Sequence, residues 1–395
     1  EEEEGGRGGA AGEHGGSAEA AEQAAEDRHF SSCVHAFFDY GAWLRPEFER
    51  RARHWGALSP EHVALLGGES VLQARHNTAL KCLEQNARVL RRAVATHATE
   101  NDNAMSGGSG NANTVVVTSP ERHMVKVRST LRQIARDWSS AGKAERDSCY
   151  APLISAIQAH LAPVTADNFG QQRVLVPGSG LGRLVFDLAV AGYDTQGNEF
   201  SYFMLLMGDH IMNRSAGIDC FHVHPWLGGA NNVMSRDDEF EAISFPDVHP
   251  SKLVREAPGN VRMSVAAGEF LMCYDTPAGA STWDAIATCF FIDTAPNIID
   301  YIEAIHRMLV PGGIWTSIGP LEYHWKTFRD GAKFQDDARY HESVELSFED
   351  VRRVMLGVGF ELLQEERREC VYASHPQCMK KTVFDTVFFV ARKKI

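Results

Sequence analysis

Apolar residues follow two different patterns along this chain, one before about residue 160 and another after it. In the first part they recur every three or four residues, the spacing that puts side chains on one face of a helix. In the second part, short β-branched and aliphatic runs alternate with helical stretches and with turns rich in glycine and proline. Such an alternation of strands and helices predicts an α/β fold with a mainly parallel sheet.

Helices are expected to dominate the part before the sheet. The helical spacing there is carried by Phe30, Val34, Phe37, Phe38, Val71, Leu72, Leu80, Leu83, Val89 and Leu90. One helix should begin at Pro60 with Ser59 as its N-cap, because proline suits the first helical turn. Another helix is predicted shortly before the sheet, with an apolar face made of Leu131, Ile134, Ala135 and Trp138.

Seven segments are predicted to be strands, at 174–176, 194–199, 261–267, 285–291, 314–318, 360–370 and 383–392. The fourth and fifth flank an expected helix over 297–309, which the sequence Pro311-Gly312-Gly313 should stop. Strand, helix and strand form a βαβ unit, whose two strands run parallel. Ligands of such sheets bind beyond the carboxyl ends of the strands.

The first strand leads into a glycine-rich turn. The sequence RVLVPGSGLG (173–182) places Gly178, Gly180 and Gly182 where the backbone can turn sharply and approach a ligand closely. The apolar run 184–190 then indicates a helix whose first amides are free. Strand, glycine turn and helix together are typical of a nucleotide-type cofactor site.

The identity of the cofactor depends on the spacing of these glycines. A dinucleotide fingerprint GxGxxG would need glycine where Arg183 stands, whereas the spacing GxGxG is typical of S-adenosylmethionine (SAM) enzymes. Glu199 lies about 20 residues beyond the turn, the offset of an acidic residue that accepts hydrogen bonds from ribose hydroxyls. A carboxylate at this position would repel the 2′-phosphate of NADP, but it does not distinguish NAD from SAM. The alternative is that Glu199 binds no cofactor and lies in solvent.

Further candidates lie on the helix before the sheet and after the third strand. Gln133 and Arg136 are one turn apart, and an arginine there could bind the carboxylate of the amino-acid end of SAM. The alternative is a solvated helix face. Glu269 and Phe270 could offer an acceptor for the adenine amine and an apolar surface for its ring. Here the alternative is an ordinary junction between strand and turn.

The crevice beyond the fourth and fifth strands gathers more polar residues. Asp293 follows the fourth strand, which ends near Cys289, and the loop 319–324 follows the fifth. We expect these residues to face the same crevice as Gly178. A mere helix N-cap is the alternative for Asp293.

Composition adds a domain prediction and excludes some partners. We expect a disordered tail over 1–28, a helical region over 29–98, a flexible linker over 99–120 and an α/β domain over 121–395, with insertions near 215–259 and 319–346. The net charge of −13 lies largely in residues 1–27, which supply −8 through nine acidic side chains and one basic. The remaining −5 indicates no basic face for a nucleic acid.

The cysteines and histidines give no sign of a metal centre. The eight cysteines form no CxxC pair, and His222 and His224 have no third ligand at a suggestive spacing, so we expect no metal. Nothing resembles a secretory or membrane-spanning segment. We therefore expect an intracellular protein with reduced thiols and no membrane partner, in the cytoplasm and with the nucleus as a second location.

Longer motifs carry a family resemblance over nearly everything after about residue 29. They are KAERDSCY (143–150), VPGSGLGRL (176–184), GYDTQGNEFSYFML (192–205), FPDV (245–248), WDAIATCFFIDTA (283–295), PGGIW (311–315) and GPLEYH (319–324), together with HAFFDYG and KCLEQN in the N-terminal helices. Through these motifs the chain resembles the carnosine N-methyltransferase family, a branch of the seven-stranded, Rossmann-like, SAM-dependent methyltransferases.

The resemblance implies roles at individual positions. The cofactor contacts would be Gln133, Arg136, Gly178, Glu199, Glu269, Phe270 and Cys289. Asp293 and His324 are similar to the pair that holds the substrate imidazole, and Tyr323 beside them is a further candidate for substrate contact. The family also uses tyrosines before its final strand, where this chain has Thr382 and Phe384. That departure leaves the acceptor open.

The function implied is SAM-dependent methylation of a histidine nitrogen in carnosine, which gives anserine, or in a related peptide, and the family suggests a homodimer. A protein histidine or another small nitrogen acceptor is the alternative substrate. A nicotinamide-dependent oxidoreductase and a non-catalytic SAM-binding scaffold are the alternatives from other classes.

Overall fold

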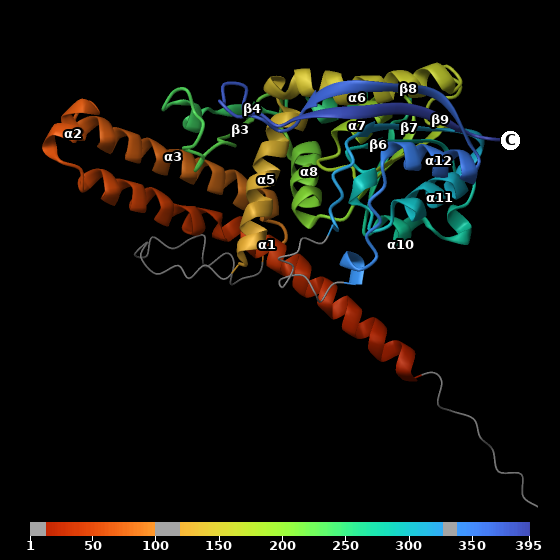
Figure 1. Ribbon diagram of the computed structural model, residues 1–395, viewed down its shortest axis with the longest axis horizontal. Helices are drawn as coiled ribbons and strands as arrows, with labels where there is room; N and C mark the ends of the chain where they lie inside the picture. Colours follow the sequence, from red (N-terminus) through yellow and green to blue (C-terminus); the bar gives the residue numbers. More distant parts are fainter. Residues whose placement is uncertain (1–12, 99–118, 327–337) are drawn as a thin grey trace, which may run out of the picture.

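A seven-stranded sheet forms the centre of the computed structural model, which describes residues 13–98, 119–326 and 338–395 (Figure 1). The strands are β1 (Arg173–Pro177), β2 (Asp194–Glu199), β5 (Arg262–Ala267), β6 (Trp283–Cys289), β7 (Leu309–Gly319), β8 (Phe360–Val371) and β9 (Val383–Lys393). Their order in the sheet is β5-β2-β1-β6-β7-β9-β8. The first five in this order run parallel, and β9 pairs antiparallel with both β7 and β8. The predicted α/β fold with seven strands is confirmed.

Helices cover both faces of the sheet. They are α6 (Lys143–His160) and α7 (Arg183–Val190) on one face, and α10 (Phe270–Tyr274), α11 (Ile298–Met308) and α12 (Phe348–Val358) on the other. Successive residues of a strand point to opposite faces, so Val174 and Val176 join the first layer while Leu175 joins the second. Strand β1 lies between β2 and β6, so the strand order reverses beside it: the chain continues from β1 to β2 and β5 on one side and then to β6 on the other. In a parallel sheet, a crevice opens at the carboxyl end of the strand where the order reverses.

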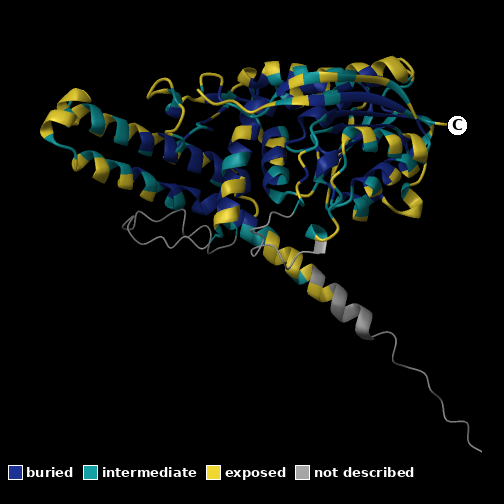
Figure 2. Cartoon of the chain, in the orientation of Figure 1, coloured by how far each residue is buried: buried dark blue, intermediate teal, exposed yellow. Residues whose placement is uncertain are grey.

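The N-terminal helices share one apolar core with part of the sheet domain. They are α1 (Glu13–Gly56), α3 (Glu69–Val94) and α5 (Glu121–Trp138), and α8 (Tyr202–Arg214) packs against them. The short helix α2 (Pro60–Leu65) lies between α1 and α3 in the chain and adds no residue to this core. Phe37 stacks on Phe203 of α8 at 5.7 Å between ring centroids. Figure 2 shows buried residues of α1 and α3 near the sheet domain, whereas α2, at the far tip of this helical arm, has none.

The predicted insertion near 215–259 docks on the helical arm. It contains β3 (Phe221–Val223), β4 (Ile243–Phe245) and α9 (Pro250–Glu256), with β3 and β4 paired antiparallel. The side chain of Asn86 on α3 donates to His224 O and accepts from His224 N, at 2.9 and 2.7 Å. These bonds extend the contact between the insertion and α3.

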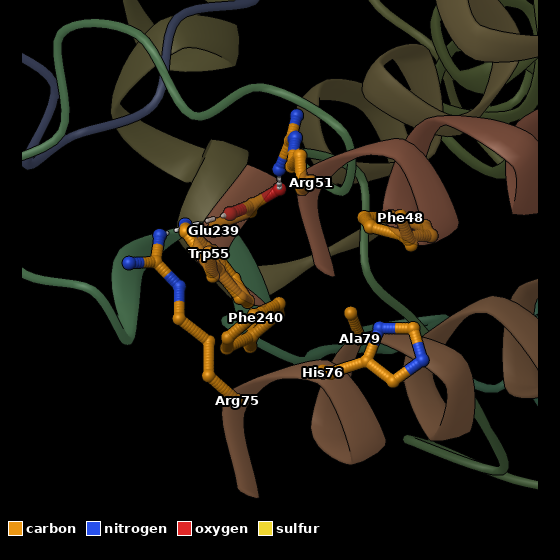
Figure 3. Close-up of a pocket in the computed structure, with 8 residues that line it drawn as sticks. All are labelled: Phe48, Arg51, Trp55, Arg75, His76, Ala79, Glu239 and Phe240. Carbon is orange, nitrogen blue, oxygen red and sulfur yellow. Dashed lines mark hydrogen bonds and ion pairs between the residues drawn. The ribbon is translucent and has the colours of Figure 1, made fainter. Parts of the chain in front are cut away.

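A buried ion pair adds to this docking. Glu239 of the insertion is fully buried and lies 2.6 Å from Arg51 and 3.5 Å from Arg75, so it points between two cations of the arm (Figure 3). The cavity beside it measures about 10 Å³, which is room for about one water molecule. This cavity is therefore too small for a cofactor.

Several boundaries differ from the sequence prediction. Helix α1 begins at Glu13, so the disorder predicted over 1–28 is wrong for 13–28, where alanine and glutamate favour a helix. Strand β6 ends two residues earlier than predicted, because Phe290 has a φ of +52°. Strand β7 starts at Leu309 and runs through the PGG sequence that was expected to precede it.

The predicted linker over 99–120 falls almost wholly outside the described residues, as does the middle of the insertion near 319–346.

Candidate functional site

The glycine turn lies directly beyond β1, where the parallel strands end. Gly178, Gly180 and Gly182 all have positive φ, at 64°, 55° and 79°, a conformation that costs little only for glycine. A Cβ on Gly178 would lie 2.5 Å from the Phe291 ring, so glycine is also required there for space. Arg183 starts α7, and its guanidinium bonds to Asp187 at 2.8 Å. The turn therefore has the predicted GxGxG form.

Glu199, at the end of β2, reaches back to this turn. Its two carboxylate oxygens accept hydrogen bonds from the amides of Gly180 and Ser201, each at 2.8 Å. Burial raises the pKa of Glu199 although these amides stabilise its charge. The alternative of a carboxylate free in solvent is wrong. Each carboxylate oxygen has a further lone pair, so Glu199 keeps capacity for a ribose hydroxyl.

Three predicted cofactor residues meet at the end of α5. Gln133 and Arg136 are each 8% exposed, so the alternative of a solvated helix face is wrong. Arg136 Nη1 donates to Gln133 Oε1 at 3.4 Å, and Nη2 lies 3.8 Å from Cys289 Sγ at the end of β6. Arg136 Nε forms an ion pair with Glu145 at 2.9 Å. The long Nη contacts leave these donors available to a carboxylate ligand.

Tyr372, just after β8, joins the same group, although it was not among the predicted site residues. Its hydroxyl accepts a hydrogen bond from Gln133 at 3.0 Å, and its ring lies 5.1 Å from the Arg136 guanidinium carbon and 4.9 Å from the Phe290 ring. The tyrosine in KAERDSCY, Tyr150, also faces Arg136, at 5.2 Å. Aromatic rings thus enclose the cation.

Glu269 and Phe270 stand at the start of α10. Glu269 is the N-cap of this helix and accepts from Met272 N at 2.8 Å. Phe270 is buried against Phe291 and Tyr301, at 5.3 and 5.0 Å between ring centroids. The junction has a structural role of its own, and contact of these residues with adenine stays a prediction.

Asp293 joins the loop after β6 to the loop after β7. Its side chain is 3% exposed and accepts from Glu322 N at 2.8 Å, while its carbonyl accepts from His324 N at 3.1 Å. Burial raises the pKa of Asp293, although the Glu322 amide and His324 lower it. The alternative of a helix N-cap is wrong, because Asn297 caps α11.

The printed contacts join Glu199 to the glycine turn, and Arg136 to Gln133 and Cys289. A common crevice for all the predicted residues stays a prediction. Phe291, which touches the glycine turn, is two residues from Asp293, and His324 is exposed beside that carboxylate. Tyr323 differs: it is 7% exposed, and its hydroxyl donates to Leu346 O at 2.8 Å, so this hydroxyl already has a structural partner.

The two histidines of the insertion have partners of their own. His222 Nδ1 lies 2.9 Å from Ser244 Oγ, and His224 Nδ1 lies 2.8 Å from Phe240 O. Within 13–98, 119–326 and 338–395 the structure groups no three histidine, cysteine or carboxylate side chains in a way that could hold a metal ion. None of the described helices has the length and apolar character needed to cross a membrane.

Comparison with known proteins identifies the family of this chain. A model of the carnosine N-methyltransferase family matches residues 113–395. The carnosine N-methyltransferase of Rattus norvegicus is 36% identical over 382 residues, which cover 94% of this chain and 88% of the relative. The one of Schizosaccharomyces pombe is 37% identical over 364 residues, or 90% and 93% of the two chains. With a family match over more than half of its length, this chain belongs to the carnosine N-methyltransferase family and is a methyltransferase.

Proposed function

We propose that this enzyme transfers the methyl group of SAM to a histidine imidazole nitrogen of carnosine, giving anserine, or of a related histidine-containing peptide. The names of the relatives support the substrate, and the glycine turn with its surrounding polar groups supports the cofactor. The observation that carries the proposal is the buried Asp293 carboxylate, two residues after Phe291, whose ring lies against Gly178 of the glycine turn.

The residues around the turn fit SAM. Glu199 would hold the ribose, the Arg136 guanidinium and Gln133 would hold the amino-acid end, and the positive φ angles of the glycines let the backbone approach it. Cys289, Glu269 and Phe270 complete the proposed cofactor contacts. Bound SAM supplies a methyl group on a positively charged sulfur.

Asp293 would orient the acceptor. A neutral imidazole has a nucleophilic lone pair on one nitrogen and a hydrogen on the other. If Asp293 accepts a hydrogen bond from that N–H group, it fixes the tautomer and stabilises the imidazolium that develops during transfer. His324, exposed beside Asp293, would complete the polar clamp. Orientation of the nucleophile then supplies much of the rate increase, since no strong base is needed.

The residues before the final strand differ from the family pattern, but one tyrosine, Tyr372, lies close to them. Thr382 and Phe384 stand at the positions where tyrosines are expected, and Phe384 packs 5.7 Å from Phe290. Tyr372 lies 6.1 Å from Phe384 between ring centroids, with its hydroxyl on Gln133. We propose that Tyr372 supplies the phenolic hydroxyl that these two positions lack, so that a small peptide remains the favoured acceptor over a protein histidine.

The test is methyl transfer from radiolabelled SAM to carnosine, to other histidine dipeptides and to histidine-containing proteins. We expect the highest kcat/KM with a histidine dipeptide. Asp293→Asn should lower kcat by roughly 10²- to 10³-fold and leave SAM affinity nearly unchanged. Asp300→Asn, on the exposed side of α11, is the matched control. Labelling of proteins alone would favour the protein-histidine alternative, and binding of NAD without SAM would overturn the proposal.

A further inference from the structure

The carboxylate of Asp137, next to Arg136 at the end of α5, faces the glycine turn. Asp137 is 2% exposed, and a Cβ on Gly180 would lie 3.8 Å from its Oδ2. Its Oδ1 accepts a hydrogen bond from the Tyr150 hydroxyl at 2.8 Å. In the described parts of the chain, no group donates a hydrogen bond to Oδ2. One oxygen is thus anchored, and the other directs free lone pairs toward the turn.

The backbone around Asp137 is fixed to the turn and to α7. The Arg183 guanidinium donates to Asp137 O at 2.9 Å, and the Trp138 indole donates to Leu181 O at 3.1 Å. Trp138 and Leu181 are both fully buried. Asp137 therefore keeps its position relative to Gly180 by bonds on both sides, which is the support that a precise binding group needs.

Asp247 of the FPDV motif, in the insertion, helps to hold the end of α5 in place. Asp247 accepts from Arg183 at 2.6 Å and from Arg146, and Arg146 also donates to Arg136 O at 2.6 Å. One carboxylate thereby ties two buried arginines, which in turn hold the carbonyls of two consecutive residues at the end of α5. Asp247 is a positioning residue in this arrangement.

Arg136 and Asp137 present opposite charges from consecutive positions. Their closest charged atoms, Arg136 Nη1 and Asp137 Oδ1, are 3.7 Å apart, which is longer than a direct hydrogen bond. A carboxylate oxygen without a donor, on a side chain as little exposed as Asp137, favours a ligand that supplies a cation or a donor. The amino-acid end of SAM carries a carboxylate and an ammonium on the same carbon, so the pair complements both groups.

We propose that Asp137 binds the ammonium of the amino-acid end of SAM through Oδ2 while Arg136 binds its carboxylate. This inference rests on the proposed function, because it takes SAM as the cofactor. A charge-assisted hydrogen bond of this kind corresponds to about 10- to 100-fold in affinity.

The test compares two ligands on two proteins by calorimetric titration. The ligands are S-adenosylhomocysteine and its analogue with hydrogen in place of the α-amino group. For the full chain we expect the analogue to bind about 10- to 100-fold more weakly. Asp137→Asn should weaken S-adenosylhomocysteine by a similar factor and should bind both ligands within about twofold of each other.

Two further variants keep the result interpretable. Asp147→Asn, at an exposed position of α6, should retain the full preference for the amino group. Tyr150→Phe removes the anchor of Oδ1 and should reduce that preference even if Asp137→Asn does not fold. An Asp137→Asn protein that binds S-adenosylhomocysteine and still prefers the amino group refutes the inference alone. If neither ligand nor SAM binds the unaltered chain, the proposed function itself fails.

Discussion

The buried imidazole of His210 should make the stability of this enzyme depend on pH. His210 lies on α8, is fully buried, and packs 4.9 Å from the Phe221 ring. Neither ring nitrogen has a hydrogen-bond partner among the described residues. Burial, with Arg92 and Arg214 nearby, lowers the pKa of His210 from 6.5 to about 4, although Asp209 acts in the opposite direction.

The sign follows from where the proton binds. Between pH 6.5 and about 4 the unfolded chain takes up a proton at this histidine and the folded chain does not. The folded state therefore loses stability as the pH falls through this range. With about 1.4 kcal/mol per pH unit, the loss is about 2 kcal/mol between pH 7 and pH 5, and about 3 kcal/mol by pH 4.

The assay is urea unfolding of the native chain and of His210→Leu between pH 7 and pH 5. Other groups titrate in both proteins, so the difference between the two stabilities isolates His210. We expect His210→Leu to be at least as stable at pH 7, because it removes two unpartnered buried nitrogens, and to gain about 2 kcal/mol relative to the native chain by pH 5. Leu206→Ala, on the same helix, should show a difference that does not change with pH. A constant difference for His210→Leu would refute the reasoning.

Three further predictions concern the crevice and its support. Asp247→Ala should lower the free energy of unfolding by about 3–5 kcal/mol, because two buried arginines lose their shared carboxylate. Urea unfolding measures this change. The control Asp194→Ala, which removes a partly exposed ion pair with Arg173, should lower the free energy of unfolding by at most about 1 kcal/mol. Gly178→Ala should abolish SAM binding in calorimetry, since its methyl group would overlap the Phe291 ring and its φ is positive; unchanged affinity would contradict the description of the turn. Asp293→Asn should be at least as stable as the native chain at pH 7, because burial raises the pKa of this carboxyl and its ionised form destabilises the folded state. The native chain should then gain stability relative to this variant as the pH falls, which urea unfolding at pH 7 and pH 5 would detect.

The sequence predicted the parts of the site that depend on local patterns. The strand before Gly178, the glycine turn and the start of α7 lie within a short stretch, where apolar runs and glycine spacing are direct signals. The expectation that Asp293 faces the crevice has a similar reason, since the carboxyl ends of parallel strands meet at one edge, and it stays a prediction.

Contacts between distant segments could not be predicted in the same way. Gln133 and Tyr372 are 239 positions apart, and nothing local to either residue indicates that their side chains bond. The role of Tyr323 was also hidden, because the bond of its hydroxyl to Leu346 depends on how the loop after β7 folds back. The only sign of Tyr372 in the sequence was that the segments of the last two strands are rich in aromatic residues.

The shared apolar core has a practical consequence for anyone shortening this enzyme. The family match begins at residue 113, which invites expression of a fragment that starts there. Such a fragment would expose the apolar face of α8, including Phe203, to water, because α1 and α3 pack against this helix. It would also leave Glu239 without Arg51 and Arg75. We expect that truncated protein to aggregate, which would make the helical arm necessary for folding.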